Sequence, residues 1–528
     1  MSSRRFIVPA LLILLAGILR TIAIGNQELW LDEALSWHMA RSSGALDVIL
    51  PSNTPPLYYF VLRGWIDVLG DSRAMLRLLS AVEGTVFVAA VMWWARTLFT
   101  RRVALWAGLW AAVAPMAIYY SQETRAYAQL TLLLALMYGC ISKALRDERL
   151  AWWGAATIAA VAAIHTHYMT PLCLAFSAGL IAAQPSPAAW RRARVCAGIL
   201  ILTSVPWMMA AWWTEHTDVP DGLEWIATIW ARTPPSLALF KSLEVLTLGG
   251  DSEVLPTRFK QLSGLALPPS LRLLGLTGLL VLAVVAVSRF GESAVAGMRR
   301  RQWATSLLTL GPLLVLWSLS WLRPLYVVGR YDQIVMPGFP IILGLACAKL
   351  QARLGTALTG AVALLLLVPI GWRLWLYYDA PAPDREARAA AVLDSQTTNG
   401  DVVLFTELRA MPVIYELSRR GFGFSGERCT DGDRELVCRT YPRDPLGRFG
   451  VQMTPAEPSV ATATDIAAGR LSERNAVWLV LGAYRSSKGT LAASRSSAAL
   501  MTRLIEIGME KRSADIAAGI LELRSSHR

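Results

Sequence analysis

Long apolar runs separated by short polar segments fill the first 379 residues of the chain. About eleven of these runs are roughly 17–23 residues long, the length at which a helix crosses ~30 Å of hydrocarbon. Their approximate centres, in chain order, are Leu15, Val86, Ala111, Leu134, Ile158, Phe176, Leu202, Leu280, Leu313, Leu343 and Leu366. The pattern predicts a polytopic α-helical membrane protein with about eleven transmembrane helices.

The first apolar run, from about Phe6 to Ile24, follows the cationic pair Arg4 and Arg5. A cleaved signal peptide begins in the same way, but no small-residue cleavage site stands out after this run. We therefore expect a first helix that is retained.

Cationic residues gather at every second boundary between the predicted spans. The clusters are Arg4/Arg5, Arg96/Arg101/Arg102, Lys143/Arg146/Arg149, Arg191/Arg192/Arg194, Arg289/Arg299/Arg300/Arg301 and Lys349/Arg353. Because Lys and Arg are enriched in cytoplasmic loops, this alternation places the N-terminus in the cytoplasm. An odd number of spans then places the C-terminus outside, and the predicted location is a plasma membrane, in a bacterium the inner membrane.

Three polar stretches face outward in this topology. Residues 25–73 and 214–269 form outer loops of a multi-span domain at 1–379, and residues 380–528 form a small extracytoplasmic α/β domain. In that domain the periodicity predicts a helix from Asp384 to Leu393 that is capped by Asp384. Residues 402–405 and 477–481 are short apolar runs, typical of buried strands.

Two of the six cysteines, Cys429 and Cys438, lie in the predicted outer domain and close a short loop. In an oxidising compartment we expect them to form a disulfide. A zinc pair is the alternative, but no His accompanies them.

Composition supports a membrane protein and argues against nucleic-acid binding. Of the 528 residues, 54% are hydrophobic and 17% are charged, whereas a soluble protein has about 25% charged residues. The 21 Trp residues suit the interfacial belt of a membrane. The net charge of +13 lies largely in short loops between spans, where it orients the protein and does not indicate a nucleic-acid partner.

Two acidic segments stand at predicted outer boundaries. Asp32 and Glu33 follow the first apolar run, and Glu123 follows a later one. A carboxylate held at a membrane boundary costs free energy, so it usually marks a functional site. Helix capping is the alternative for Asp32 and Glu33, since Asp is a favoured N-cap and a helix near Ala34 would need one. For Glu123 the alternative is an ion pair with Arg125.

The motifs around these acids resemble bacterial GT-C glycosyltransferases, the polyprenyl-phosphate-sugar-dependent membrane enzymes related to protein O-mannosyltransferases and to the aminoarabinose transferase of lipid A. The segments that carry the resemblance are Leu29–Ala34, Pro55–Tyr59, Gly70–Ser72 with Arg77 and Ser80, Tyr119–Ala128, and Gly329–Tyr331 followed by Pro337 and Pro340. One position departs from the family pattern, because Thr54 stands where many members have His before the Pro-Pro pair. The fold that the resemblance implies is a GT-C transmembrane domain.

The resemblance also implies roles for the acidic residues. Asp32, paired with Glu33, would be the base that takes the acceptor proton, and direct displacement would invert the anomeric centre. Glu123 would orient the acceptor or bind a divalent cation through its oxygens. The cofactor requirement is otherwise unknown from the sequence.

Cations and aromatic residues complete the predicted site. Arg330 is the first choice for holding the donor phosphate, because a guanidinium offers a bidentate fork, and Arg125 and Arg77 are second choices. Tyr58, Tyr59 and Tyr331 are candidates for contacts with the substrate, although interfacial tyrosines commonly form an aromatic belt. The alternative for these arginines is that they lie at the membrane interface and extend their guanidinium groups to water, without binding the substrate.

His165 and His167 form a His-x-His turn at an outer face. Two His residues are too few for a structural metal site, so metal binding is only a weak candidate role for them. The alternatives are that these histidines contact a hydroxyl or a phosphate of the substrate, or that they form an outer turn without a functional role.

The sequence thus predicts an enzyme that moves a monosaccharide from an undecaprenyl- or decaprenyl-phosphate donor to an envelope glycolipid, polysaccharide or protein. A transporter or flippase of a lipid-linked substrate is the alternative, but the chain shows no duplicated half of the kind that many transporters contain. A non-catalytic scaffold is a third reading.

Overall fold

The computed structural model describes most of the helical part of the chain and about half of the C-terminal part. The described residues are 4–41, 55–184, 186–218, 226, 235–249, 267–288, 297–379, 382, 384–406, 410–425, 428–441, 476–481, 483–485, 491–493, 501–502, 504–506, 508–515 and 519–525. Most of the predicted outer loop at 214–269 therefore lies outside the described residues.

The chain divides into two compact units. The first contains Met1–Gly25, Leu46–Asp218 and Leu223–Pro381, and the second contains Asn26–Ala45, Val219–Gly222 and Ala382–Arg528. The later boundary lies close to residue 380, where the composition changes. The segment Asn26–Ala45, which the sequence assigned to an outer loop of the transmembrane domain, belongs instead to the second unit.

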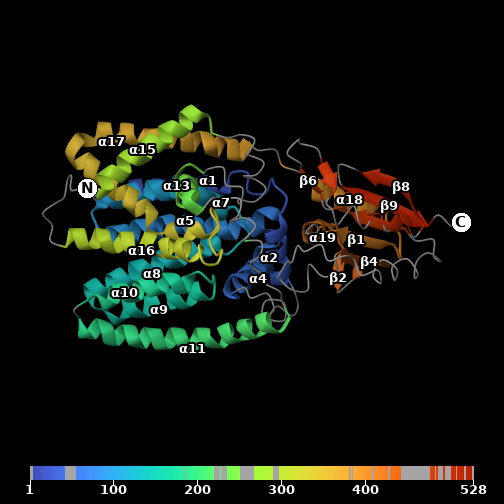
Figure 1. Ribbon diagram of the computed structural model, residues 1–528, viewed down its shortest axis with the longest axis horizontal. Coiled ribbons are helices and arrows are strands. Elements are labelled where there is room, and N and C mark those ends of the chain that lie inside the picture. Colours follow the sequence, from blue (N-terminus) through green and yellow to red (C-terminus); the bar gives the residue numbers. More distant parts are fainter. Residues whose placement is uncertain are drawn as a thin grey trace. The chain divides into compact units, whose positions relative to one another are not determined.

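The first unit is built of helices (Figure 1). They are α1 (Arg4–Thr21), α4 (Leu57–Leu69), α5 (Arg73–Leu98), α6 (Arg101–Val113), α7 (Pro115–Ser121), α8 (Tyr127–Asp147), α9 (Leu150–Ile164), α10 (Thr170–Ala182), α11 (Pro187–Asp218), α13 (Pro235–Leu248), α15 (Pro269–Val287), α16 (Met298–Leu319), η3 (Tyr331–Val335) and α17 (Phe339–Asp379). Each of the predicted span centres lies inside one of these helices.

The number of spans is less regular than the hydropathy pattern suggested. Among the described residues, five helices are long and apolar enough to cross a membrane, and α6 with α7 makes a sixth if the bent pair counts as one span. The bend of 58° falls at Pro115, because proline lacks the N–H that would continue the helix. Leu343 and Leu366 share α17, whose Gly355 has φ 78° and interrupts the helical path. The count of eleven stays a prediction.

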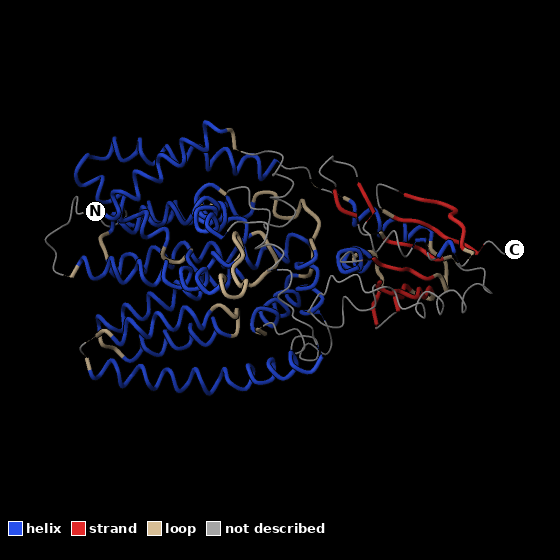
Figure 2. Tube along the Cα trace, in the orientation of Figure 1, coloured by secondary structure: helices blue, strands red, loops and turns tan. Residues whose placement is uncertain are grey.

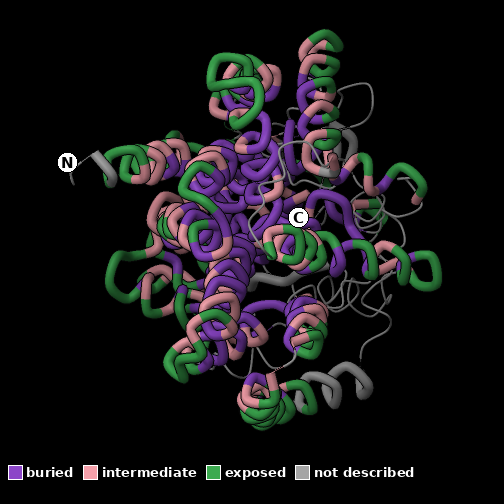
Figure 3. Tube along the Cα trace, turned by 90° about the vertical axis from the view of Figure 1, so that its left-hand side faces the viewer, coloured by how far each residue is buried: buried purple, intermediate pink, exposed green. Residues whose placement is uncertain are grey.

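Apolar side chains cover the outside of these helices as well as their packed faces. Figure 3 shows buried residues where helices face one another and exposed residues around the periphery. Large exposed hydrophobic residues include Phe6, Leu11, Leu14, Ile158, Val195, Leu202, Leu273, Leu280, Val284, Leu364 and Leu322. Such a surface suits lipid and not water, so the chain is a membrane protein.

A buried arginine ties the first helix to the bend between α6 and α7. The Arg20 guanidinium donates hydrogen bonds to the carbonyl oxygens of Ala111 (3.0 Å) and Ala112 (3.1 Å) and to Ser121 Oγ (3.2 Å). The two carbonyls belong to the last turn of α6, which lacks partners within the helix, so the cation caps this helix end.

We expect Arg20→Met to destabilise the protein by roughly 2–4 kcal/mol, because several buried acceptors lose a charged donor. The readout is the thermal unfolding temperature of the purified protein in detergent. Arg102→Met, which removes an exposed cation from the start of α6, is the matched control. If both variants unfold at the wild-type temperature, Arg20 does not hold this bend.

Among its described residues, the second unit contains a seven-stranded sheet together with helices (Figure 2). The strands are β1 (Val402–Thr406), β2 (Gly423–Ser425), β3 (Arg428–Asp431), β4 (Arg434–Tyr441), β5 (Val477–Val480), β8 (Met509–Asp515) and β9 (Ile520–Ser525), with β6 (Ala483–Arg485) and β7 (Leu491–Ala493) forming a separate pair. The order is β2-β3-β4-β1-β5-β9-β8, and β1 runs parallel to β4 and β5. The strands expected at 402–405 and 477–481 correspond to β1 and β5, which are neighbours in the middle of this sheet.

The helices of this unit are α2 (Leu31–Arg41), α18 (Arg385–Gln396) and α19 (Ala410–Ser418). α2 packs on α19, and the rings of Trp37 and Tyr415 meet edge to face with centroids 5.2 Å apart. This contact explains why a segment close to the N-terminus belongs with the C-terminal unit.

The predicted cap of α18 is wrong. The Asp384 side chain makes no capping hydrogen bond and pairs with Arg388 at 3.2 Å instead. The carboxylate of the distant Glu28 accepts from the backbone N–H groups of Glu386 (3.2 Å) and Ala387 (2.6 Å). An anion at a helix N-terminus is favourable whichever part of the chain supplies it.

Cys429 is disulfide-bonded, as the sequence analysis expected for this residue. It stands on β3, opposite Leu436 of β4. The side chain of Cys438 lies outside the described side chains.

Candidate active site

The second acidic motif lies in the turn between α7 and α8. Glu123 is buried there, with 4% of its surface exposed, and its Oε1 accepts a 2.6 Å hydrogen bond from the Tyr119 hydroxyl. Gln122 is fixed on the other side of the turn, where its Nε2 donates to Arg20 O (3.1 Å) and Ile22 O (2.8 Å). The Tyr119 hydroxyl therefore holds one oxygen of the Glu123 carboxylate, while Gln122 ties the turn to the end of α1.

A hydrogen bond connects this turn to the segment that carries Arg330. The Tyr120 hydroxyl donates to Gly329 O at 2.5 Å, and Gly329 N donates to Asp332 Oδ2 at 2.8 Å. Gly329 has φ 79°, a left-handed conformation that favours glycine. The tight turn places Arg330 at the start of η3, next to the second acidic motif.

Four aromatic rings pack together next to the turn that carries Arg330. Stacked rings of His167 and Tyr168 lie 4.4 Å apart, and Tyr127 and Tyr331 approach His167 at 5.4 and 6.4 Å between centroids. The Tyr168 hydroxyl donates to the Tyr331 hydroxyl at 2.5 Å. Tyrosine and imidazole faces of this kind can pack against a sugar ring, and their polar atoms can hydrogen-bond its hydroxyl groups.

Two guanidinium groups give this cluster a positive field. Burial and then the charges of Arg125 and Arg330 lower the pKa of His167 to about 3. The imidazole is therefore neutral at physiological pH, and its Nδ1 accepts from Met169 N at 3.2 Å. Both cations lie close enough to His167 to act on it, and guanidinium groups of this kind are well suited to bind a phosphate.

Asp332 is buried beneath the same turn. Burial raises the pKa of its carboxyl to about 6, although hydrogen bonds from Gly329 N, Tyr326 and Ser242 oppose the rise. The hydroxyls of Tyr326 and Ser242 are also hydrogen-bonded to one another. Asp332 therefore supports the backbone that presents Arg330.

The depressed pKa of His167 predicts an acid-sensitive fold. Its ordinary pKa is 6.5 and its folded value is about 3, so between these values the unfolded chain binds a proton that the folded chain does not. Stability should fall as pH falls through this window, by up to about 1.4 kcal/mol per pH unit. We expect the unfolding temperature to drop less between pH 7 and 5 in His167→Gln than in wild type. Equal drops in both proteins would refute this role of His167.

The segment with the Pro-Pro pair joins the histidine turn directly. Leu57 N donates to His165 O at 2.8 Å, which links the start of α4 to the end of α9. Tyr58 and Tyr59 are buried in α4 and their rings meet edge to face at 5.6 Å. Both are thus packed inside the protein, and the alternative of an interfacial belt does not describe them.

Arg77 and Glu83 lie on α5. The Arg77 guanidinium donates to Ile24 O at 3.0 Å, and it is buried, so it is anchored at the end of the first helix. The Glu83 carboxyl lies close enough to the Tyr58 hydroxyl to interact with it electrostatically. The charge of Arg125 acts on the same hydroxyl.

The first acidic motif opens α2 in the second unit. Asp32 and Glu33 both lie in the first turn of this helix, where anions are favourable. Glu33 is buried, with 1% of its surface exposed, and its Oε2 is 3.4 Å from Trp30 N. Asp32 is half-buried. The helix begins at Leu31 and not near Ala34, so both acids lie within its first turn and not at the N-cap position that the capping alternative expected.

The metal candidates do not converge. The His165 Nδ1 is 3.0 Å from Val161 O, and the His167 Nδ1 is engaged with Met169 N. Within the described ranges, no three His, Cys, Asp or Glu side chains come together as a set that could hold a metal ion.

Sequence reasoning did not find Tyr119, Tyr127 and Asp332. Each lies within four positions of Glu123, Arg125 or Arg330, which the sequence analysis did identify. Two features of the sequence could have indicated them. Tyr residues are unusually dense around Glu123 and Arg330, and an acidic residue directly follows Arg330 and Tyr331.

Comparison with known families matches part of the chain, which includes Glu123, Arg125 and His167 but neither Asp32 nor Arg330. The sequence model of dolichyl-phosphate-mannose-protein mannosyltransferases matches residues 53–195. No curated protein matches the chain by sequence.

Comparison with solved structures covers nearly the whole chain. The apo structure of ArnT from Cupriavidus metallidurans has a TM-score of 0.60 at 13% identity, over 99% of this chain and 98% of that one. ArnT bound to undecaprenyl phosphate gives 0.60 at 14% identity, over 97% of each chain. The oligosaccharyltransferase AglB from Archaeoglobus fulgidus, in complex with an inhibitory peptide and a dolichol-phosphate, gives 0.52 at 11%, over 94% and 75%. The predicted resemblance to GT-C glycosyltransferases and their fold is confirmed.

Proposed function

We propose that this protein is a GT-C-type membrane glycosyltransferase that moves a monosaccharide from a polyprenyl-phosphate donor to an acceptor of the cell envelope. The observation that carries the proposal is the site in the helical unit, where the charges of Arg125 and Arg330 both act on a buried His167 and where the turn that carries Arg125 also carries the buried carboxylate of Glu123. These residues offer cations that can bind a phosphate, aromatic rings that can pack on a sugar, and a carboxylate that can orient an acceptor. The ArnT-like fold and the matched mannosyltransferase region support the same reaction class.

In the proposed reaction the donor carries its own leaving group. The acceptor hydroxyl oxygen attacks the anomeric carbon, and the bond between that carbon and the phosphate oxygen breaks. The electron pair stays on the polyprenyl phosphate, whose growing charge Arg330 and Arg125 stabilise. A single displacement of this kind inverts the anomeric configuration.

The proton of the acceptor hydroxyl goes to the carboxylate of Asp32. Glu33 lies beside it in the same helical turn and is buried, so it holds the start of α2 and adds negative charge near the base. Glu123, fixed by Tyr119, orients the acceptor through its carboxylate. The described residues supply no three-ligand set for a divalent cation, so no step is assigned to a metal ion.

The proposed location is the inner membrane, with the N-terminus in the cytoplasm and the C-terminal unit on the periplasmic side. The alternation of cationic loops supports this orientation. A polyprenyl-phosphate sugar and an envelope acceptor would both reach the site from that side. The partners are thus a lipid-linked donor, membrane lipid and a glycolipid, polysaccharide or protein acceptor.

A reconstitution assay separates transfer from transport. The purified protein is placed in vesicles with lipid-linked sugars and envelope acceptors from cells that lack it. A glycosidic bond on the acceptor, with released polyprenyl phosphate, is the expected product. Movement of the intact donor to the other leaflet without any new bond would favour the transporter alternative and contradict the proposal.

A further inference from the structure

The last turns of α17 contact the turn that carries Glu123. Tyr377 lies two residues before the end of this helix and is buried, with 2% of its surface exposed. Its hydroxyl donates to Gln122 Oε1 at 3.0 Å, across 255 positions of the sequence. Its ring also meets the ring of Tyr119 edge to face, with centroids 6.3 Å apart. One side chain of α17 therefore contacts two residues that lie next to Glu123 or bind it.

The side chain of Gln122 is fixed from both of its ends. Its Oε1 accepts from Tyr377, and its Nε2 donates to Arg20 O at 3.1 Å and Ile22 O at 2.8 Å. An amide has a donor end and an acceptor end, so these three bonds together determine its orientation. The backbone N–H of Gln122 donates to Tyr119 O at 2.9 Å, which closes the turn. The hydroxyl of Tyr377 thus helps to hold both the side chain and the backbone at this position.

Two short routes connect Tyr377 to the carboxylate of Glu123. The first runs through Gln122, which directly precedes Glu123 in the turn. The second runs through Tyr119, whose ring packs on Tyr377 and whose hydroxyl donates to Glu123 Oε1 at 2.6 Å. Gln122 and Tyr119 are both buried, so their side chains have little freedom to adopt other orientations.

A second contact from α17 supports the opposite end of α7. The buried Arg373 donates from Nε to Gly249 O at 2.8 Å. Gly249 has φ 66° and lies between Arg373 and Pro115, because a Cβ built there would be 3.2 Å from Arg373 Cγ and 2.9 Å from Pro115 Cβ. Pro115 is the first residue of α7. The end of α17 therefore holds α7 near its start through Arg373 and after its end through Tyr377.

We propose that Tyr377 is a positioning residue for the transfer reaction and orients the Glu123 carboxylate through Gln122 and Tyr119. The inference rests on the proposed function, in which Glu123 orients the acceptor. A small misplacement of a group that orients a reactant slows the reaction, because the acceptor oxygen must meet the anomeric carbon in line with the breaking bond. Without the Tyr377 hydroxyl, the buried Gln122 Oε1 would lose this donor and the turn would be less firmly held.

Tyr377→Phe removes the hydroxyl and keeps the ring. We expect the initial rate of transfer to fall by roughly tenfold, the scale of losing one buried hydrogen bond that acts on the transition state. The measurement is release of undecaprenyl phosphate by full-length protein in vesicles, with a saturating extract of lipid-linked sugars and envelope acceptors from cells that lack it. Tyr378→Phe is the matched control and should keep the wild-type rate. It makes the same chemical change one residue later, where the hydroxyl donates to Leu19 O of α1 and not to the turn.

A double-mutant cycle separates positioning from general structural damage. If Tyr377 acts through Glu123, Tyr377→Phe should slow the Glu123→Gln protein little further. Two independent defects would instead multiply. Binding of undecaprenyl phosphate, measured by native mass spectrometry, should be the same in Tyr377→Phe and wild type, because Arg330 lies on a separate segment that Gly329 and Asp332 hold.

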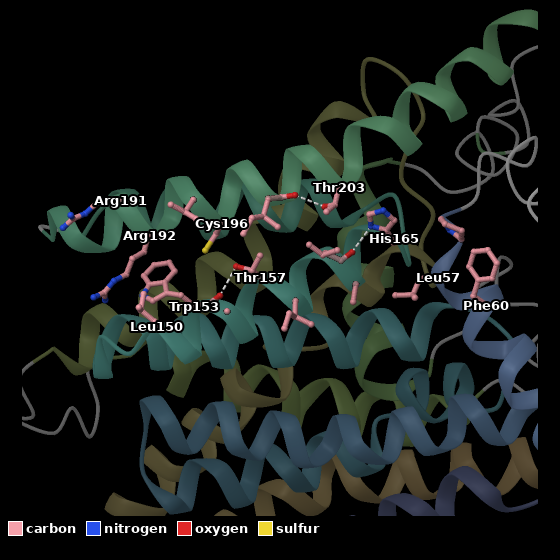
Figure 4. A pocket seen from close by; sticks show the side chains of 17 residues that line it. Leu57, Phe60, Leu150, Trp153, Thr157, His165, Arg191, Arg192, Cys196 and Thr203 are labelled. Atoms are coloured by element: carbon pink, nitrogen blue, oxygen red, sulfur yellow. Dashed lines mark hydrogen bonds between the residues drawn. The ribbon is translucent and has the colours of Figure 1, made fainter.

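Hydrogen–deuterium exchange tests the same contact without any sugar transfer. A peptide that covers residues 119–126 should exchange faster in Tyr377→Phe than in wild type or Tyr378→Phe, because the amide of Gln122 depends on the turn. A peptide from α9 is the internal reference and should exchange equally in all three proteins. This helix lines a separate apolar pocket, to which neither Tyr377 nor Gln122 contributes (Figure 4).

Three results would overturn the inference: unchanged exchange at residues 119–126, equal loss of rate in the two Tyr variants, or losses that multiply in the cycle. Failure of the proposed function would look different. In that case wild-type protein would release no undecaprenyl phosphate from the extract, whereas failure of this inference alone would leave wild type active and Tyr377→Phe equally fast.

Discussion

Asp32→Asn should reduce glycosyl transfer by roughly 10²–10⁴-fold, the usual contribution of a general base. An amide has nearly the shape of the carboxylate but cannot take the acceptor proton at neutral pH. Because Asp32 is half-buried in the first turn of α2, the substitution removes a charge without leaving a cavity. The measurement is the initial rate of transfer by purified, reconstituted protein at saturating donor and acceptor.

Asp67→Asn is the matched control for this experiment. Asp67 is an exposed carboxylate of α4, within the same outer part of the sequence, and its loss should leave the rate unchanged. The unfolding temperature of both variants shows whether they are folded. If folded Asp32→Asn keeps most of the wild-type rate, Asp32 is not the base, and its role is confined to the start of α2.

Arg330→Ala should raise the KM for the donor by roughly 10–100-fold, the equivalent of losing a hydrogen bond to a charged group, about 1.5–3 kcal/mol. The KM for the acceptor should change little, because the guanidinium is assigned to the donor phosphate. Arg330→Lys should restore only part of the affinity, since an ammonium keeps the charge but loses the bidentate fork.

Arg323→Ala is the control for this substitution, because it removes an exposed cation from the same turn between α16 and α17. Arg330 also stands at the start of η3, so a structural role would show a different signature. An equal rise in KM for donor and acceptor, together with a lower unfolding temperature, would indicate that Arg330 holds the turn and does not bind the phosphate.

The helical unit was largely predictable from hydropathy. Every predicted centre falls within a helix because apolar runs of this length must satisfy their backbone internally in lipid. The number of spans was not predictable in the same way. Pro115 bends one span, and Gly355 interrupts α17, and neither break interrupts the apolar pattern enough to be located from hydropathy alone.

Contacts between distant residues explain most of what the sequence missed. Asp384 is a good N-cap by residue type, but Glu28, more than three hundred and fifty positions away, supplies the carboxylate. In the same way, packing of Trp37 on Tyr415 draws residues 26–45 into the second unit. Local patterns carry no information about such partners.

The charged residues of the candidate site were proposed from the sequence, whereas the residues that support them were not. Glu123, Arg125 and Arg330 stood out because charges are rare near membrane spans. For His167 the sequence offered weak metal binding, contact with a hydroxyl or phosphate, or a plain outer turn. Its burial and its exposure to the charges of Arg125 and Arg330 depend on how separate turns meet. Asp332 was missed because its role is to accept a hydrogen bond from Gly329 N within a single turn. The sequence of this turn resembles that of an ordinary surface loop.

Mass spectrometry of lipids and glycans from cells that lack this protein tests the central claim most directly. The account predicts that one polyprenyl-phosphate monosaccharide accumulates while one envelope glycan disappears. Wild-type protein should reverse both changes, and Asp32→Asn should reverse neither. An unchanged glycan profile, or full restoration by Asp32→Asn, would contradict the proposed transfer reaction.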